Sequence, residues 1–260
     1  MASQGNRGNS HTQRFERYLT LPEHEQRALQ MLSVIYHPVS RTALMNCLNS
    51  ANIKNGQGKR WTALLLQQPV LNWTQIGLVI QSSAGIQCHP KIVELLTREV
   101  VKRNALLAYA QIAEKHVSGA SNGLDPVDVT IRFARLGVYL NDSAQVAEAL
   151  AQRGYGVVDL ATVFRTVYFN PFDRDWFLSL DPELIVMVFE IELRDAVLSL
   201  KPNPDLFELL ESVLVSGGQL AQSAPLIALL CEQYLLQGRI QEARAQIARL
   251  TTLDQYAGHV

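Results

Sequence analysis

Residues 78–88 read LVIQSSAGIQC, and their pattern differs from the helical spacing of the segments around them. Leu78-Val79-Ile80-Gln81 is apolar and β-branched, Ser82-Ser83-Ala84-Gly85 supplies turn residues, and Ile86-Gln87-Cys88 begins a second run. Short apolar runs separated by turn residues are typical of a β-hairpin. Val70-Leu71-Asn72-Trp73, just upstream, has the same character. We therefore predict a small hairpin here, in a chain whose other segments have helical spacing.

Two helices are predicted well upstream of the hairpin. The first opens at Leu21-Pro22, since proline is favoured in the first turn of a helix, and its apolar residues recur every three or four positions up to Ile35. The second begins near Ser40 and ends in the Asn/Gly-rich run at residues 52–58.

A third helix is predicted over Lys59–Gln68, closed by Pro69. It is expected to bury Trp61, Leu64 and Leu65. After the hairpin, His89-Pro90 starts another helix. Apolar spacing predicts that this helix continues, with a kink, to about His116.

Three helices, a β-hairpin and a closing helix in this order resemble a winged helix-turn-helix domain. The resemblance covers about residues 20–105 and is one of architecture. It implies that Lys59–Gln68 is the recognition helix and that Ser82–Gly85 is the tip of the wing.

From Gly119 onward the sequence predicts consecutive helices with short connections. Three pairs place a capping side chain before a proline at the first helical position, and glycines stand where helices are expected to stop. The pairs are Asp125-Pro126, Asp181-Pro182 and Asn203-Pro204. Helices joined by short connections are expected to pack in antiparallel fashion.

The last two predicted helices, over about residues 224–257, resemble one tetratricopeptide repeat. Leu230, Tyr234 and Ala243 match its hallmark positions outright, and Cys231 replaces the usual glycine by another small residue. Ile227 and Ile247 stand where aromatic residues are usual. The same register fails one repeat earlier. The resemblance thus implies a single such hairpin in an irregular helical array.

Together these patterns predict a mainly α protein with three parts. Residues 1–18 are expected to be a flexible tail, 19–118 a winged-helix domain with a long linking helix, and 119–260 a tetratricopeptide-like α-helical domain. The sequence has no long apolar run and no signal peptide, which predicts a cytoplasmic protein. Its cysteines, Cys47, Cys88 and Cys231, are far apart, which favours buried thiols over disulfides or a metal site.

Charge is divided unequally along the chain. Residues 1–105 hold twelve Lys and Arg against five acidic residues, a net charge of +7, whereas 106–260 hold eleven basic and nineteen acidic residues, a net charge of −8. A strongly basic part is typical of a protein that meets a polyanion. DNA is therefore the partner predicted for the N-terminal part.

The residues predicted to contact nucleic acid lie on the expected recognition helix and around it. Arg and Gln can read base edges, whereas Lys and Arg neutralise phosphates. The wing tip has neither Lys nor Arg, and Ala63 and Leu66, expected on the outer face of the third helix, would suit a protein partner as well. The predicted contacts are Lys54, Lys59, Arg60, Thr62, Gln67, Arg98, Lys102 and Arg103.

A protein partner is predicted for the helical array, at Phe172, Trp176 and Tyr234. Phe172 and Trp176 belong to an aromatic cluster around Asn170-Pro171 that could line a peptide groove, although such a cluster also fits a packed corner between two helices.

No enzyme motif, metal site or cofactor site is recognised. Gly56-Gln57-Gly58-Lys59 lacks the spacing of a phosphate-binding loop. We therefore expect a non-catalytic, DNA-directed regulatory or recruiting module. The alternatives are a protein-interaction scaffold that self-associates, and the N-terminal accessory region of a larger ATPase or helicase-like protein.

Overall fold

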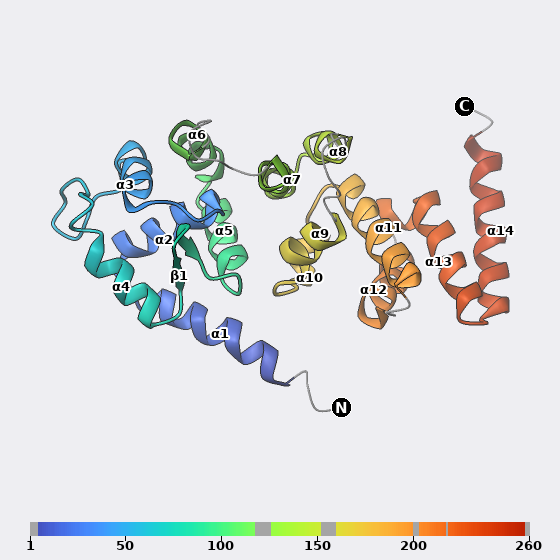
Figure 1. Cartoon of the computed structure of the whole chain (residues 1–260). Coiled ribbons are helices and arrows are strands. Elements are labelled where there is room, and N and C mark those ends of the chain that lie inside the picture. The colour runs from blue at the N-terminus through green and yellow to red at the C-terminus, as the bar shows by residue number, and fades with distance from the viewer. Residues whose placement is uncertain (1–4, 118–125, 152–159, 200–202, 217, 258–260) are drawn as a thin grey trace. The chain divides into compact units, whose positions relative to one another are not determined.

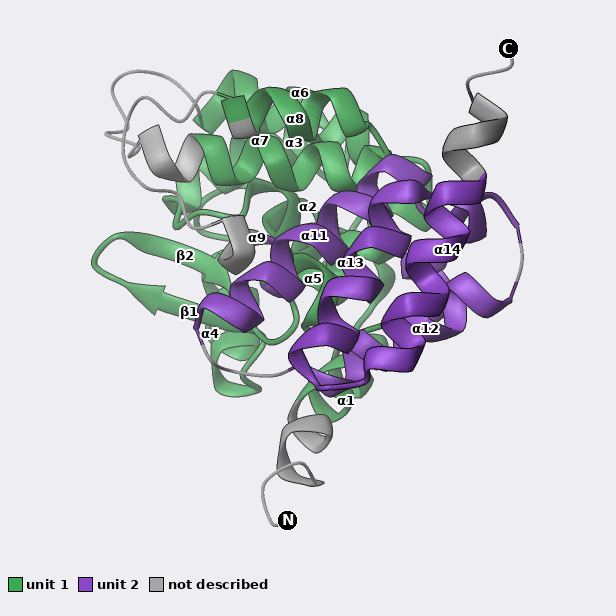
Figure 2. Cartoon of the chain, turned by 90° about the vertical axis from the view of Figure 1, so that its right-hand side faces the viewer, with its two compact units in different colours: residues 1–158, 166–173 green, residues 159–165, 174–260 purple. Residues whose placement is uncertain are grey.

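A computed structural model of the chain describes residues 5–117, 126–151, 160–199, 203–216 and 218–257 (Figure 1). The described residues form fourteen α-helices and a two-stranded antiparallel sheet, which confirms the mainly α fold class. They group into two compact units (Figure 2). Unit 1 comprises residues 1–158 and 166–173, and unit 2 comprises residues 159–165 and 174–260.

Unit 1 contains the hairpin and the helices that precede and follow it. Two of these helices, α7 and α8, fall in the segment that was expected to form a second domain. The elements of unit 1 are α1 (Gly5–Leu19), α2 (Glu23–Ile35), α3 (Arg41–Ser50), α4 (Gln67–Gln75), β1 (Val79–Ser82), β2 (Gly85–Cys88), α5 (Val93–Lys102), α6 (Leu106–Val117), α7 (Pro126–Leu140) and α8 (Ser143–Ala151).

The hairpin predicted at residues 78–88 is confirmed. Strands β1 and β2 pair in antiparallel register from Val79 opposite Cys88 to Ser82 opposite Gly85. Val39, in the connection between α2 and α3, forms a further bridge to Ile86, with N–O distances of 2.9 and 2.8 Å. The hairpin is therefore tied to the helices that precede it.

Replacing Gly85 by alanine is expected to disrupt this bridge. Gly85 has a φ of +133°, and a Cβ there would lie 2.6 Å from the carbonyl oxygen of Val39. Since backbone cannot move aside like a flexible side chain, we expect a loss of about 3 kcal/mol in the free energy of unfolding. Urea denaturation would measure this loss.

Gly58→Ala is the matched control for that substitution. Gly58 also has a positive φ, +72°, but a Cβ added there would meet no heavy atom within 4 Å apart from its chain neighbours. Its expected cost is about 1 kcal/mol, the cost of the backbone conformation alone. Equal losses for both variants would contradict the close approach at Gly85.

The first two predicted helices are confirmed as α2 and α3. Ala28, Leu29, Leu32 and Ile35, the apolar positions of α2, are all buried. The hydroxyl of Ser40 accepts a hydrogen bond from the backbone N–H of Ala43 and so caps the start of α3.

The prediction of a third helix over Lys59–Gln68 is wrong. Residues 59–62 are not helical, and α4 begins only at Gln67. Pro69 lies in the first turn of α4, where a missing N–H costs nothing, and therefore opens this helix instead of closing a previous one. Residues 70–73, whose apolar character resembles that of the hairpin strands, are likewise not extended, because they lie in α4.

The helix expected to continue to His116 is two helices, α5 and α6. They are separated at Asn104, which has a φ of 54°. Asparagine tolerates this left-handed conformation, which ends helices. At the N-terminus the structure also differs from the expected tail, since residues 5–19 form α1. Tyr18 of α1 is buried in the core of unit 1 and accepts a hydrogen bond from Gln30.

Unit 2 is entirely helical in its described part. Asp181 caps α11 and Asn203 caps α12, each before a proline, as predicted. Asp125, the third predicted cap, lies outside the described residues. The elements are the first half of α9 (Leu160–Phe169), whose second half belongs to unit 1, then α10 (Arg174–Leu178), α11 (Pro182–Leu198), α12 (Pro204–Val215), the 3-10 helix η2 (Gln219–Gln222), α13 (Ala224–Leu236) and α14 (Ile240–Ala257).

Helices α13 and α14 form an antiparallel hairpin. Ile227, Leu230, Tyr234 and Ala243 are buried, and Gly238 turns the chain between the helices with a φ of 71°. Ile247, in contrast, is half exposed.

The three cysteines are buried and free, as predicted. Burial raises the pKa of Cys47 to about 11 and raises the pKa of Cys88 as well, so both thiols stay protonated at neutral pH. In the described part of the chain, no helix combines the length and the apolar character that a bilayer span requires.

Candidate nucleic-acid interface

The segment between α3 and α4, residues 51–66, carries the exposed positive charge predicted for the interface. We call residues 52–61 the basic loop. Its cations Lys54, Lys59 and Arg60 are exposed, and none of them takes part in the ion pairs found among the described residues. Their charges therefore face solvent without a carboxylate partner from the described part of this chain.

Asn55 organises the basic loop from inside. Its side chain is buried, and the Oδ1 atom accepts hydrogen bonds from the backbone N–H groups of Gln57 (2.9 Å) and Lys59 (3.0 Å). Its backbone N–H donates to the carbonyl of Lys59, and its carbonyl accepts from Gly58. The loop is therefore held by its own hydrogen bonds, and Lys59 has a defined backbone position.

Trp61 anchors the end of the loop to α3. The ring is only 3% exposed. The side-chain amide of Asn49 both donates to the Trp61 carbonyl and accepts from the Trp61 N–H, each at 2.9 Å. On the α2 side, the ring centroid of His24 lies 6.1 Å from that of Trp61. The loop cations thus project from a scaffold fixed to two helices.

Helix α4 follows the loop after a short turn at residues 62–66 (Figure 1). Trp73 is fully buried on its inner face, and the indole N–H donates to the carboxylate of Glu25 at 2.6 Å. The exposed face carries no charge. It consists of Gln67, Gln68, Leu71 and Gln75.

Thr62 and Gln67 are exposed, as a contact role requires. The Thr62 hydroxyl accepts from the N–H of Leu65 at 3.2 Å, and its carbonyl accepts from the N–H of Leu66, so Thr62 shapes the turn that leads into α4. All of the predicted contacts in this part of the chain are exposed and lie within one continuous segment of sequence, namely Lys54, Lys59, Arg60, Thr62 and Gln67.

Arg98, which was predicted to contact nucleic acid, is buried in the structure. It is only 6% exposed and donates through Nη2 to the carbonyls of Val167 and Pro171, both at 3.1 Å. Asp173 lies 3.9 Å from its Nη1 atom. A guanidinium enclosed in this way fastens α5 to the end of α9 and the segment after it, and it cannot reach a phosphate.

Lys102 and Arg103 are exposed but have carboxylate partners in the chain. Lys102 lies 2.8 Å from Glu99, and Arg103 lies 3.4 Å from Glu23. Their charge is therefore partly neutralised, and the two residues contribute less to the positive potential than the cations of the basic loop.

Two features of unit 1 were not identified from the sequence. The first is a set of exposed leucines, Leu64, Leu65 and Leu71, of which the first two were expected in the core; Leu64 is 77% exposed. The expectation failed because it placed them on a helix that does not form. Leu66, expected on the outer face of that helix, is buried instead.

The second feature is a basic cluster at α1. Arg14 donates to the carbonyl of Gly77 at 2.9 Å, and Arg17 donates to that of Ile76 at the same distance. Burial, together with Arg14, Lys91 and His11, lowers the pKa of His89. The two arginines tie α1 to the turn between α4 and β1. Only the helical spacing of α1 could have indicated the cluster.

The predicted protein-contact residues are in different environments. Phe172 is 41% exposed and its ring stacks on that of Phe169, and Trp176 is partly exposed. Tyr234 is buried, donates to Glu211 at 2.7 Å and lies under the guanidinium of Arg239. The structure therefore does not leave Tyr234 free for a surface contact, because it packs against Phe207 and Glu211 of α12.

Among the described residues, no group of His, Cys, Asp or Glu side chains is arranged to hold a metal ion. Comparison with protein-family models, with curated proteins and with solved structures gives no match.

Proposed function

We propose that unit 1 is a winged-helix-like module that binds duplex DNA. The order α2, Val39 bridge, α3, α4, β1 and β2 supports this reading, because the hairpin then takes the place of the wing. On this reading the recognition helix is α4, and not the helix that was predicted over residues 59–68. The expected wing tip remains the turn between β1 and β2.

The basic loop is the observation that carries the proposal. Three cations without carboxylate partners among the described residues project from a loop fixed by Asn55 and Trp61. A fixed cationic loop loses little conformational entropy when it meets phosphates. Only residues 62–66 separate the loop from α4, so phosphate contacts and groove contacts would come from one segment.

Helix α4 would supply the contacts to bases. Glutamine amides can pair with the adenine edge in the major groove, and Leu71 can contact a thymine methyl group. Since the exposed face of α4 is uncharged, most of the affinity would come from the loop. We therefore expect moderate affinity with a clear dependence on salt.

Unit 2 would hold a protein partner through its tetratricopeptide-like hairpin. This part of the proposal is supported by apolar side chains that remain exposed on α13 and α14. Leu235, Leu236, Ile240 and Ile247 are each about half exposed in unit 2.

The test is the salt dependence of DNA binding, followed by fluorescence anisotropy of a labelled mixed-sequence duplex. Three phosphate contacts predict a loss of about 40-fold in affinity between about 50 and 200 mM salt. Lys59→Glu and Arg60→Glu are each expected to weaken binding about tenfold and to reduce the salt slope by about one unit.

Lys115→Glu is the matched control, because Lys115 is an exposed cation of unit 1 on α6 rather than on the loop. It makes the same change in net charge. Equal weakening by all three variants would indicate a nonspecific charge effect and would contradict an interface at the loop.

The second candidate function is a protein-interaction scaffold, which the exposed Leu64, Leu65 and Leu71 favour. If so, the double variant Leu64→Ser and Leu71→Ser would abolish self-association in analytical ultracentrifugation. DNA binding of the wild type would be weak in that case, and Lys59→Glu would not weaken it further.

A further inference from the structure

Helix α1 places a second cationic site at the far end of α4. The Nη1 atom of Arg17 donates to the carbonyl of Ile76 at 2.9 Å, and the Nε atom of Arg14 donates to that of Gly77 at 2.9 Å. Both carbonyls belong to the turn that follows Gln75, the last residue of α4. Arg17 is exposed, whereas Arg14 is partly buried. Arg17 therefore lies at the C-terminal end of α4, while the basic loop precedes its N-terminal end.

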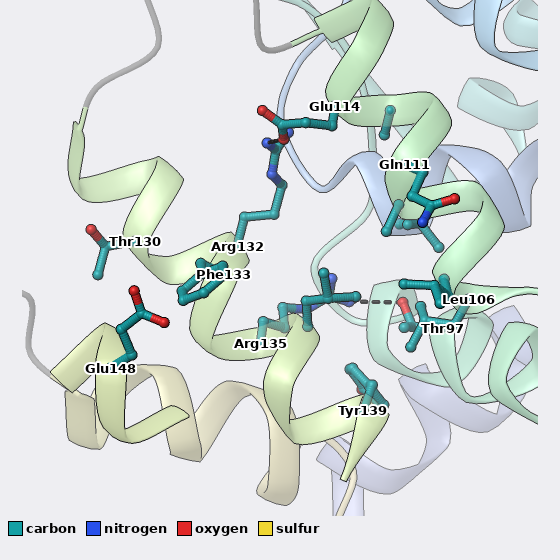
Figure 3. A pocket seen from close by; sticks show the side chains of 15 residues that line it. Thr97, Leu106, Gln111, Glu114, Thr130, Arg132, Phe133, Arg135, Tyr139 and Glu148 are labelled. Atoms are coloured by element: carbon teal, nitrogen blue, oxygen red, sulfur yellow. Dashed lines mark hydrogen bonds and ion pairs between the residues drawn. The ribbon is translucent and has the colours of Figure 1, made fainter. Parts of the chain in front are cut away.

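The charge of Arg17 has no carboxylate partner among the described residues, because Arg17 belongs to none of their ion pairs. Arg132 of α7, in contrast, is paired with Glu114 (Figure 3). The carbonyl of Ile76 is a neutral acceptor, and a guanidinium has further N–H donors for a phosphate. Arg17 is thus a cation that the turn holds in place and that remains open to an anion.

The length of α4 matches the width of a groove in DNA. The helix has 9 residues, which span about 13 Å at about 1.5 Å per residue. The major groove of B-DNA is about 12 Å wide, and a row of phosphates follows each of its edges. Figure 1 shows α4 running from the basic loop toward α1. The exposed face between the two cationic sites is uncharged and consists of Gln67, Gln68, Leu71 and Gln75.

We propose that Arg17 contacts the phosphates on one edge of a major groove while the basic loop contacts those on the other edge. This inference rests on the proposed DNA-binding function and adds a fourth phosphate contact to the three cations of the loop. Helix α4 lies between the two sites, so the partner is a duplex whose major groove admits a helix. B-form DNA meets this condition, whereas the major groove of A-form RNA is too narrow.

The salt dependence of binding measures the added contact. Four phosphate contacts predict a loss of about 150-fold in affinity between about 50 and 200 mM salt, against about 40-fold for three. Arg17→Gln removes the charge and keeps an amide N–H. It is expected to weaken binding of a mixed-sequence DNA duplex about fivefold to tenfold and to return the salt dependence to about 40-fold.

Arg17→Lys tests whether the charge or the bond to Ile76 is responsible. It restores the charge with a different donor geometry, so we expect the salt dependence of the wild type to return. A purely structural role of Arg17 would instead leave the salt dependence of both variants unchanged. Anisotropy is measured at a temperature at which circular dichroism shows each variant to be folded.

Two controls match the charge change and the ligand. Lys115→Gln removes an exposed cation from α6 and is expected to leave the affinity for DNA within twofold of the wild type. A duplex RNA of the same sequence has an equal charge but no groove wide enough for α4. Arg17→Gln is therefore expected to leave RNA binding unchanged.

The inference is overturned if Arg17→Gln changes neither the affinity for DNA nor its salt dependence while Lys59→Glu weakens binding. That result would leave the proposed function intact. Equal weakening of DNA and RNA binding by Arg17→Gln would also overturn it, because Arg17 would then act as a general cation. Absence of DNA binding by the wild type, or no effect of Lys59→Glu, would contradict the proposed function itself and this inference with it.

Discussion

Replacing Arg135 by alanine is expected to lower the free energy of unfolding of unit 1 by about 3–5 kcal/mol. The substitution leaves Glu94, which is fully buried, as an uncompensated charge. Although burial lowers the pKa of Arg135, the Glu94 carboxylate raises it above its ordinary value, so Arg135 keeps its positive charge in the folded state.

The effect is expected to be large because Arg135 joins three helices. Its guanidinium contacts Ser33 of α2, both Glu94 and Thr97 of α5, and the ring of Tyr36, whose centroid is 4.2 Å away. Tyr139 donates to the same carboxylate at 2.5 Å. Loss of the guanidinium therefore leaves several buried polar groups without their partner.

Urea denaturation monitored by tryptophan fluorescence would measure this loss. In a Trp176→Phe background the remaining tryptophans, Trp61 and Trp73, are both in unit 1, so the signal reports on that unit. Arg27→Ala removes a largely exposed pair with Glu23 and is expected to cost less than about 0.5 kcal/mol.

A double replacement separates the charge from the packing. Glu94→Leu combined with Arg135→Met removes both charges and keeps much of the volume, so most of the stability is expected to return. A change below about 1 kcal/mol for Arg135→Ala alone would contradict the view that this pair supports the packing of α7 on α2 and α5.

Local patterns predicted the elements that local chemistry determines. The hairpin follows from its apolar runs and from Gly85, and α3 follows from the capping hydroxyl of Ser40. Asp181 and Asn203 mark the helix starts in unit 2 for the same reason. In each case the decisive atoms lie within a few residues of one another along the chain.

The region before α4 could not be predicted in this way, because contacts distant in sequence determine it. Trp61 pairs its backbone with Asn49, twelve residues earlier, and this pairing takes precedence over the helical spacing of residues 59–68. The burial of Arg98 depends on carbonyls at residues 167 and 171. The sequence thus shows where the basic residues lie along the chain, but it does not show which of them are exposed.

Trp61→Ala is expected to cost about 3–5 kcal/mol of stability, since the ring is 3% exposed within the core of unit 1. At temperatures where the variant is still folded, we also expect DNA affinity to fall about tenfold. Without the Trp61 ring the loop would be mobile, and its cations would have to be ordered on binding, which costs conformational entropy.

Two variants separate anchoring from other effects of this change. Leu64→Ala alters an exposed side chain three residues away and is expected to change stability by less than about 0.5 kcal/mol. Trp61→Phe keeps an aromatic ring and loses only an indole N–H that has no hydrogen-bond partner among the described residues, so it should retain most of the affinity. DNA binding that survives Trp61→Ala in the folded protein would show that affinity does not require a fixed loop.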